Sequence, residues 1–367
     1  MRRIWPTVFA LLIMPALLDA QAAVATAARL VPSDSVDAVF PARMRELGIP
    51  GASVTVIRNG EVVLNRGFGL ADVELAAQAQ STTRYRVGSL AKPFTAVALG
   101  ILIDEGRLDL DAEVQRYVPS FPRKPWPVTV RQLAGHQAGI RHYKDGEFEN
   151  QRFYPTLLDG LRMFEDDSLL FEPGTRYSYS SFGYNLLGAV IEGASGVPYL
   201  QFMHDRVFAP LGMSATVPDF PDSIIVGRTR FYAGPDTGGP LRNAPYVDNS
   251  YKWPSGGFLS STEDLARFGQ AMLDGKLLTR GTRDVMWTPM RLRDGTVTSY
   301  GVGWNVGSDQ QGRRYVAHTG GSIGGVSVLA LYPDQHLVVA IAVNTDKGLN
   351  ALTGRVATWY AAEEVPQ

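Results

Sequence analysis

The first clear pattern of apolar and polar positions predicts a β-hairpin near the N-terminal end of the chain. Residues 52–57 are rich in β-branched and apolar types, and residues 62–64 resume the apolar pattern. Between them, Asn59-Gly60 is a two-residue turn signal. We therefore expect a hairpin over residues 51–68.

The C-terminal part of the chain has strand-like character as well. Residues 326–332 and 337–344 are apolar runs on either side of a short turn at residues 333–335. Residues 314–317 form a further expected strand, which leads into His318. Both ends of the chain therefore contribute strands.

Helix-like patterns occupy most of the sequence between these strands. An Ala-rich apolar run follows Gly88, and Thr129 with Gln132 has the spacing of a capping box. Ser261 is a candidate helix cap, and Gly193 with Gly196 is expected to close the helix before them. The expected helices lie at residues 89–105, 186–192, 199–208, 261–273 and 351–363.

The order of these elements predicts one α/β (α+β) unit. Strands at both ends and helices in the middle favour a single core with an insertion over two domains in series. We expect the core at residues 23–106 and 223–367, and a mainly helical insertion at residues 107–222. Together they form one domain over about residues 35–362.

Residues 1–22 have the pattern of a secretory signal. Arg2 and Arg3 form the charged start, residues 4–18 are apolar, and Ala20-Gln21-Ala22 offers a cleavage site before Ala23. The mature protein is expected to be periplasmic or secreted. An uncleaved membrane anchor is the alternative.

Composition and charge exclude several classes of protein. With 45% hydrophobic residues and a formal net charge of -1, the 367-residue chain is globular and has no basic run that would bind nucleic acid. It contains no cysteine, which excludes disulfides, thiolate catalysis and Fe–S clusters. The five histidines lack the spacing of a zinc site, so neither a metal nor another cofactor is expected.

One short motif carries the candidate chemistry. Gly88 permits a tight turn, and Ser89 and Lys92 are three residues apart at the start of a predicted helix. The serine hydroxyl and the lysine amine would then lie on the same helix face. A desolvated lysine can be neutral and can take the proton of a nucleophilic serine. The structural alternative is a capping serine beside a solvated lysine.

Two further motifs follow the first along the chain. The three motifs are Ser89-Leu90-Ala91-Lys92, Tyr179-Ser180-Ser181 and His318-Thr319-Gly320. With these motifs in this order, the sequence resembles the superfamily of serine β-lactamases and penicillin-binding proteins, in its class C branch, over roughly residues 35–362. Its loops at residues 139–143, 246–253 and 318–321 resemble those of the subfamily that includes mitochondrial serine β-lactamase-like proteins and bacterial relatives.

The resemblance implies a fold and a set of roles. The expected fold is an antiparallel β-sheet flanked by helices, with an inserted helical subdomain. Ser89 would be the nucleophile, Lys92 would take or relay its proton, and Tyr179 would pass a proton to the leaving group, as a phenolate if nearby cations allow. The backbone N–H groups of Ser89 and Gly321 would form the oxyanion hole.

Two positions depart from the family pattern. His318 stands where penicillin-recognising enzymes have a lysine, and histidine is charged only part of the time near neutral pH. Ser181 replaces an asparagine, so it lacks the amide that would hold a substrate peptide unit. Both are expected to face the substrate pocket. Both changes argue against an efficient β-lactamase.

Three functions therefore compete. The first is a secreted serine hydrolase that cleaves peptide, amide or ester bonds in a small-molecule or peptide substrate. The second is a weak β-lactamase or a penicillin-binding D-Ala-D-Ala carboxypeptidase. The third is a non-catalytic scaffold that assembles into a homo-oligomer. An intact set of Ser89, Lys92 and Tyr179 argues against the third, because a scaffold has no need of all three.

Overall fold

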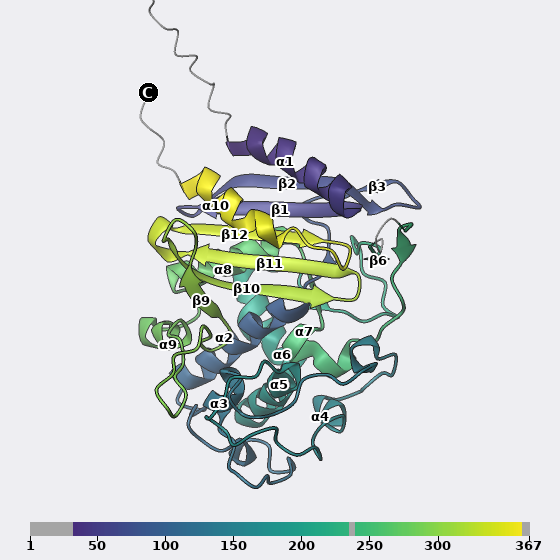
Figure 1. Cartoon of the computed structure of the whole chain (residues 1–367). Helices are drawn as coiled ribbons and strands as arrows, with labels where there is room; N and C mark the ends of the chain where they lie inside the picture. The colour runs from purple at the N-terminus through teal and green to yellow at the C-terminus, as the bar shows by residue number, and fades with distance from the viewer. Residues whose placement is uncertain (1–31, 235–238, 362–367) are drawn as a thin grey trace, which may run out of the picture.

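A seven-stranded antiparallel sheet runs through the computed structural model, which describes residues 32–234 and 239–361 (Figure 1). The predicted secretory signal lies outside these residues. The strand order is β3-β2-β1-β12-β11-β10-β9. The strands are β1 (Gly51–Arg58), β2 (Glu61–Asp72), β3 (Ala77–Gln78), β9 (Asn305–Ser308), β10 (Arg314–Ser322), β11 (Gly325–Tyr332) and β12 (Leu337–Val343).

The predicted hairpin is confirmed as β1 and β2. Asn59 and Gly60 both have positive φ, 52° and 84°, as the tight turn between right-twisted strands requires. β1 pairs with β2 on one side and with β12 on the other. The N-terminal and C-terminal strands therefore form one continuous sheet.

Helices cover both faces of this sheet, and β12 shows the consequence. Val339 and Ile341 pack with α1 (Pro32–Leu47) and α10 (Thr353–Ala361). Val338 and Ala340 belong to the cluster on the opposite face, with α8 (Thr262–Asp274). A strand that is buried on both faces needs apolar residues at every position, which explains the unbroken run in its sequence.

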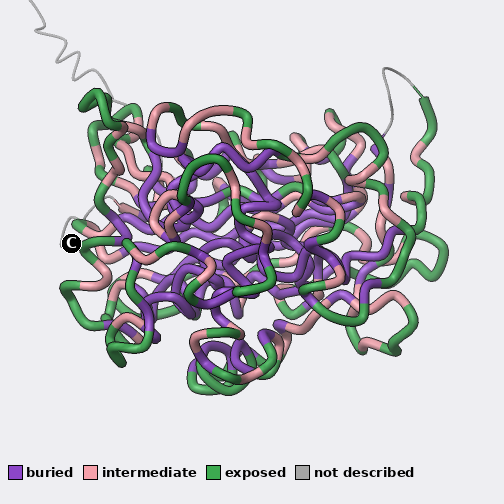
Figure 2. The backbone as a smooth tube through the Cα atoms, turned by 90° about the horizontal axis from the view of Figure 1, so that it is seen from below, coloured by how far each residue is buried: buried purple, intermediate pink, exposed green. Residues whose placement is uncertain are grey.

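The larger helical layer lies on the α8 side of the sheet. Its central helix, α2 (Ala91–Asp104), is buried on nearly all sides, from Ala91 to Leu102. Figure 2 shows such buried segments gathered at the centre and the exposed ones at the periphery. The other helices here are α3 (Val130–Ala134), α4 (Leu157–Leu161), α5 (Ser181–Ser195), α6 (Tyr199–Met203), α7 (Trp253–Gly256) and α9 (Arg280–Met286). The treatment of residues 107–222 as a separate insertion stays a prediction.

Helix boundaries differ from the expected ones where tertiary packing decides. Gly193 was expected to close a helix but lies inside α5, where an added Cβ would overlap the carbonyl oxygen of Tyr117. Gly193 is thus a packing residue, and Gly196, with φ 68°, ends the helix. α6 is shorter than expected because residues His204–Phe208 continue it as a π-helical turn. The predicted caps at Thr129 and Ser261 are confirmed.

Candidate active site

Ser89 lies on a tight turn that two strands hold in place. The Val87 N–H donates to the carbonyl of Phe258 in β8 (Phe258–Ser260), and the Ser327 hydroxyl donates to the Val87 carbonyl. Gly88 follows with φ 50°, and an added Cβ there would lie 2.8 Å from the Gly321 nitrogen. Ser89 therefore comes at the start of the α2 segment with its backbone close against β10.

Lys92 is fully buried one helical turn after Ser89. Its Nζ lies 2.9 Å from Ser89 Oγ, 3.1 Å from Ser181 Oγ and 2.8 Å from the Ser255 carbonyl oxygen. Burial, and then the nearby charge of Lys252, hold the Lys92 pKa well below its usual value. A neutral amine can donate to the carbonyl and to Ser181, which leaves its lone pair for the Ser89 proton.

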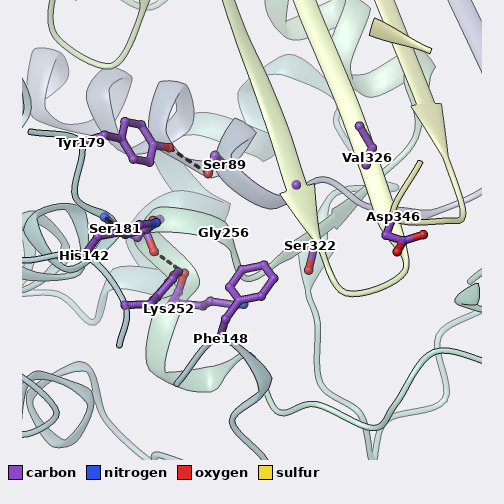
Figure 3. Close-up of a pocket in the computed structure, with 13 residues that line it drawn as sticks. Ser89, His142, Phe148, Tyr179, Ser181, Lys252, Gly256, Ser322, Val326 and Asp346 are labelled. Carbon is purple, nitrogen blue, oxygen red and sulfur yellow. Dashed lines mark hydrogen bonds between the residues drawn. The ribbon is translucent and has the colours of Figure 1, made fainter. Parts of the chain in front are cut away.

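Tyr179 gives Ser89 its second hydrogen-bond partner. The tyrosine hydroxyl donates to Ser89 Oγ at 2.9 Å, and its ring centroid is 4.8 Å from Lys92 Nζ (Figure 3). Burial raises the pKa of Tyr179 above its usual value. The geometry thus favours a neutral phenol that donates a proton, not the phenolate that the sequence suggested.

Two histidines hold the segment that carries Tyr179. The backbone N–H of Ser180 donates to His136 Nδ1, and that of Ser181 donates to His142 Nδ1, both at 3.1 Å. Desolvation, followed by the charges of Lys92 and Lys252, lowers the His142 pKa to about 4. Neutral His142 therefore carries its proton on Nε2. The sequence favoured a structural role for His142, in a loop near the mouth of the pocket.

Ser181 and Lys92 are brought together, whereas His318 turns away from them. Ser181 is the first residue of α5, and its hydroxyl faces Lys92. His318 is buried beside Tyr300, whose hydroxyl donates to His318 Nε2 at 2.9 Å, and its own Nδ1–H donates to the Thr319 carbonyl. Burial, and then the charge of Lys92, lower the His318 pKa to about 3.

This position of His318 differs from the pocket position that the sequence suggested. Side chains alternate along β10, so His318 shares a face with Gly320. That face packs against the turn before Ser89, since a Cβ at Gly320 would overlap the Val87 carbonyl oxygen. His318 is therefore a neutral packing residue, and Gly321, directly after the third motif, is the residue that reaches the cavity.

A cavity of about 380 Å³ opens in front of Ser89. This volume is enough for a small ligand or for part of a larger one. Phe148, Ser322 and Asp346, which the sequence did not indicate, also line it, together with Lys252 from the loop at residues 246–253, to which no role was assigned (Figure 3). One feature of the sequence could have indicated Lys252, since it is a lysine between two aromatic residues, Tyr251 and Trp253.

Two properties of the described residues concern metal ions and membranes. Within residues 32–234 and 239–361, no three His, Asp or Glu side chains are grouped so that they could hold a metal ion. In the same ranges, no helix combines the length and apolar character that crossing a bilayer would need.

Comparison with known proteins agrees with this geometry. The sequence profile of the family described as "Beta-lactamase" matches residues 36–362. The chain is 34% identical to "Serine beta-lactamase-like protein LACTB, mitochondrial" of Homo sapiens in an alignment that covers 79% of this chain and 70% of the relative. The resemblance inferred from the three motifs is confirmed.

Solved structures agree as well. The "octameric penicillin-binding protein homologue from Pyrococcus abyssi" superposes with a TM-score of 0.74 at 28% identity, over 85% of this chain and 73% of that one. A "D-stereospecific amidohydrolase from Streptomyces sp." gives a TM-score of 0.70 at 26% identity, over 89% of this chain and 97% of that one. The mixed fold with a central antiparallel sheet is shared with them, as the sequence predicted.

Proposed function

Because this chain belongs to the beta-lactamase family of serine hydrolases, we propose that it cleaves amide, peptide or ester bonds through an acyl-enzyme on Ser89. One observation carries the proposal. Ser89 Oγ lies 2.9 Å from the Lys92 amine and 2.9 Å from the Tyr179 hydroxyl. A nucleophile in contact with both a base and an acid is what acyl transfer requires.

Acylation then follows from the protonation states of these groups. The neutral Lys92 amine takes the Ser89 proton while Oγ forms a bond to the substrate carbonyl carbon. Tyr179 gives its proton to the leaving amine or alcohol as the scissile bond breaks, and the Lys92 ammonium supplies the proton that restores the phenol. Water then hydrolyses the ester on Ser89, which returns the serine hydroxyl and releases the acid.

The oxyanion of each tetrahedral intermediate would be held by backbone N–H groups. The proposed donors are Ser89 and Gly321, whose segments are in contact through Gly88. Donors that are fixed before the reaction cost no reorganisation when charge develops. The close packing of β10 against the Val87–Gly88 turn supports this assignment.

Amide or ester hydrolysis is favoured over β-lactam hydrolysis. Neutral His318 offers no cation at the third motif, and Ser181 offers no amide at the second. The similarity to a protein described as a D-stereospecific amidohydrolase supports the same choice. A weak β-lactamase or penicillin-binding carboxypeptidase is the competing proposal.

Intact-mass spectrometry after incubation with a fluorophosphonate, and separately with penicillin G, tests the proposal. We expect a stable fluorophosphonate adduct that Ser89→Ala abolishes and that Ser322→Ala, which removes another hydroxyl from the cavity wall, retains. A penicillin adduct on Ser89 would move the function to the competing proposal. If neither reagent forms an adduct, the proposed serine hydrolase activity is contradicted.

Two further properties belong to the proposal. The signal-like pattern of residues 1–22 supports export, and an intact mass beginning at Ala23 in the periplasm or medium would test it. Similarity to a protein described as octameric supports a homo-oligomer, which light scattering of the purified protein would test. A protein that stays monomeric at all concentrations would contradict the proposed homo-oligomer.

A further inference from the structure

Lys252 is a buried lysine in the wall of the cavity. It ends the 3-10 turn Ser250–Lys252, directly before α7, and its side chain is 2% exposed. Its Nζ lies 4.3 Å from the ring centroid of Phe148, 5.3 Å from that of Tyr251 and 5.8 Å from that of Tyr143. Aromatic faces on several sides stabilise a cation but accept no conventional hydrogen bond.

The ammonium of Lys252 has no anionic partner among the described residues. None of their hydrogen bonds or ion pairs engages its Nζ, and the acid whose charge it feels most, Asp219, is already bonded to Arg86 Nε and Asn249 Nδ2, each at 2.7 Å. A buried ammonium with three free donors is costly unless something in the cavity accepts them. The cavity therefore has a place for an anionic oxygen ligand.

We infer that Lys252 binds a carboxylate group of the substrate, on the cavity wall formed with His142 and Phe148. The inference rests on the proposed hydrolase function and narrows its substrate class. The polarity of the cavity fixes the orientation, because Asp346 lies on the other side and would repel the same carboxylate (Figure 3). His142 lies on the Lys252 side and can offer its Nε2–H as a second donor.

Because His318 stands in place of the lysine of the third motif, an anionic substrate needs another cation in the cavity, which is the role inferred for Lys252. His318 is neutral and turned toward Tyr300, so it cannot replace the lysine that this motif has in penicillin-recognising enzymes. Burial lowers the pKa of Lys252 to about 7, so binding a carboxylate would hold the amine in its charged form.

Protection of Ser89 from a neutral fluorophosphonate tests the inference on the unaltered protein. We expect glutarate and adipate to slow labelling about tenfold more than glutaramide and adipamide at equal concentration, as a charge-assisted hydrogen bond implies. Equal protection by acids and amides, or none by either, would overturn the inference. Absence of labelling without any added ligand would instead contradict the proposed function.

A matched pair of variants locates the effect. Lys252→Met should remove the advantage of the acids over the amides. Lys144→Met removes the same charge from the loop that carries Phe148, but Lys144 is exposed, is paired with Asp167 and does not line the cavity. That variant should keep the advantage. Equal loss in both variants would mean that the overall positive field, and not Lys252, attracts the acids.

Discussion

Gly320→Ala is the most direct test of how β10 is held against Ser89, the proposed nucleophile. An added Cβ would overlap the Val87 carbonyl oxygen and would lie 2.9 Å from its carbon and 2.6 Å from Ser327 Oγ. Because the first two atoms are backbone, the strand and the turn must separate by a distance on the order of 1 Å to reach van der Waals contact. Overpacking of this kind costs about 1–3 kcal/mol of unfolding free energy.

The same displacement would move Gly321 away from Ser89. A misplacement of about 1 Å in a catalytic geometry can cost on the order of a hundredfold in rate. We therefore expect Gly320→Ala to lower the apparent Tm by several degrees in a thermal melt and to slow fluorophosphonate labelling of Ser89 by about a hundredfold.

The neighbouring glycine supplies the stability control. An added Cβ at Gly321 meets no atom within 4 Å, so Gly321→Ala should melt close to wild type. If Gly320→Ala matches wild type in both melting and labelling, the contact of β10 with Val87 does not position the nucleophile. If both variants lose the same stability, the loss reflects the strand and not this contact.

Three further predictions concern the titratable groups. Burial keeps the His318 pKa at about 3, against 6.5 for an ordinary histidine, so the unfolded chain binds a proton below pH 6.5 that the folded protein does not. His318 should therefore contribute a loss of about 1.4 kcal/mol of stability per pH unit as the pH falls from 6.5 toward 3. His318→Gln should lower the slope in urea unfolding series by this amount, leaving the contribution of His142, and the exposed control His204→Gln should retain the full slope. Lys92→Arg replaces the neutral amine with a permanent cation that cannot act as a base, so labelling of Ser89 should fall by about 10²-fold or more, and normal labelling would contradict the role of Lys92. Tyr179→Phe should slow hydrolysis of anilides far more than fluorophosphonate labelling, because fluoride leaves without a proton, and equal slowing would contradict the role of Tyr179 as the acid.

The sequence predicted what depends on local chemistry and on family pattern. Asn59-Gly60 specifies its turn whatever surrounds it, and the Ser89–Lys92 spacing puts both groups on one helix face in any context. The convergence of Tyr179 and Ser181 on this pair followed from the resemblance. It could not have followed from periodicity, since about 90 residues separate the motifs.

The remaining features depend on contacts between distant segments. The direction of the His318 side chain is set by Gly320 and Val87, which are far apart in the sequence. Glycine is typical of helix ends, but Gly193 lies within its helix because the backbone of Tyr117 leaves no room there for a Cβ. The environment of the Lys252 ammonium depends on contact with the ring of Phe148, which is more than a hundred residues earlier in the chain. None of these partners can be identified from a local pattern.

The pairing of β1 with β12 also has a consequence for biosynthesis. Val54 pairs with Ile341, so the first strand of the sheet has no neighbour on that side until Ile341 has left the ribosome. The turn before Ser89 likewise waits for Gly320 and Gly321, which are made more than two hundred residues later. Contacts of such sequence separation form slowly. A nascent chain therefore carries Ser89 without a finished pocket. On the proposed function, a chain exported in the unfolded state would gain hydrolytic activity only after translocation.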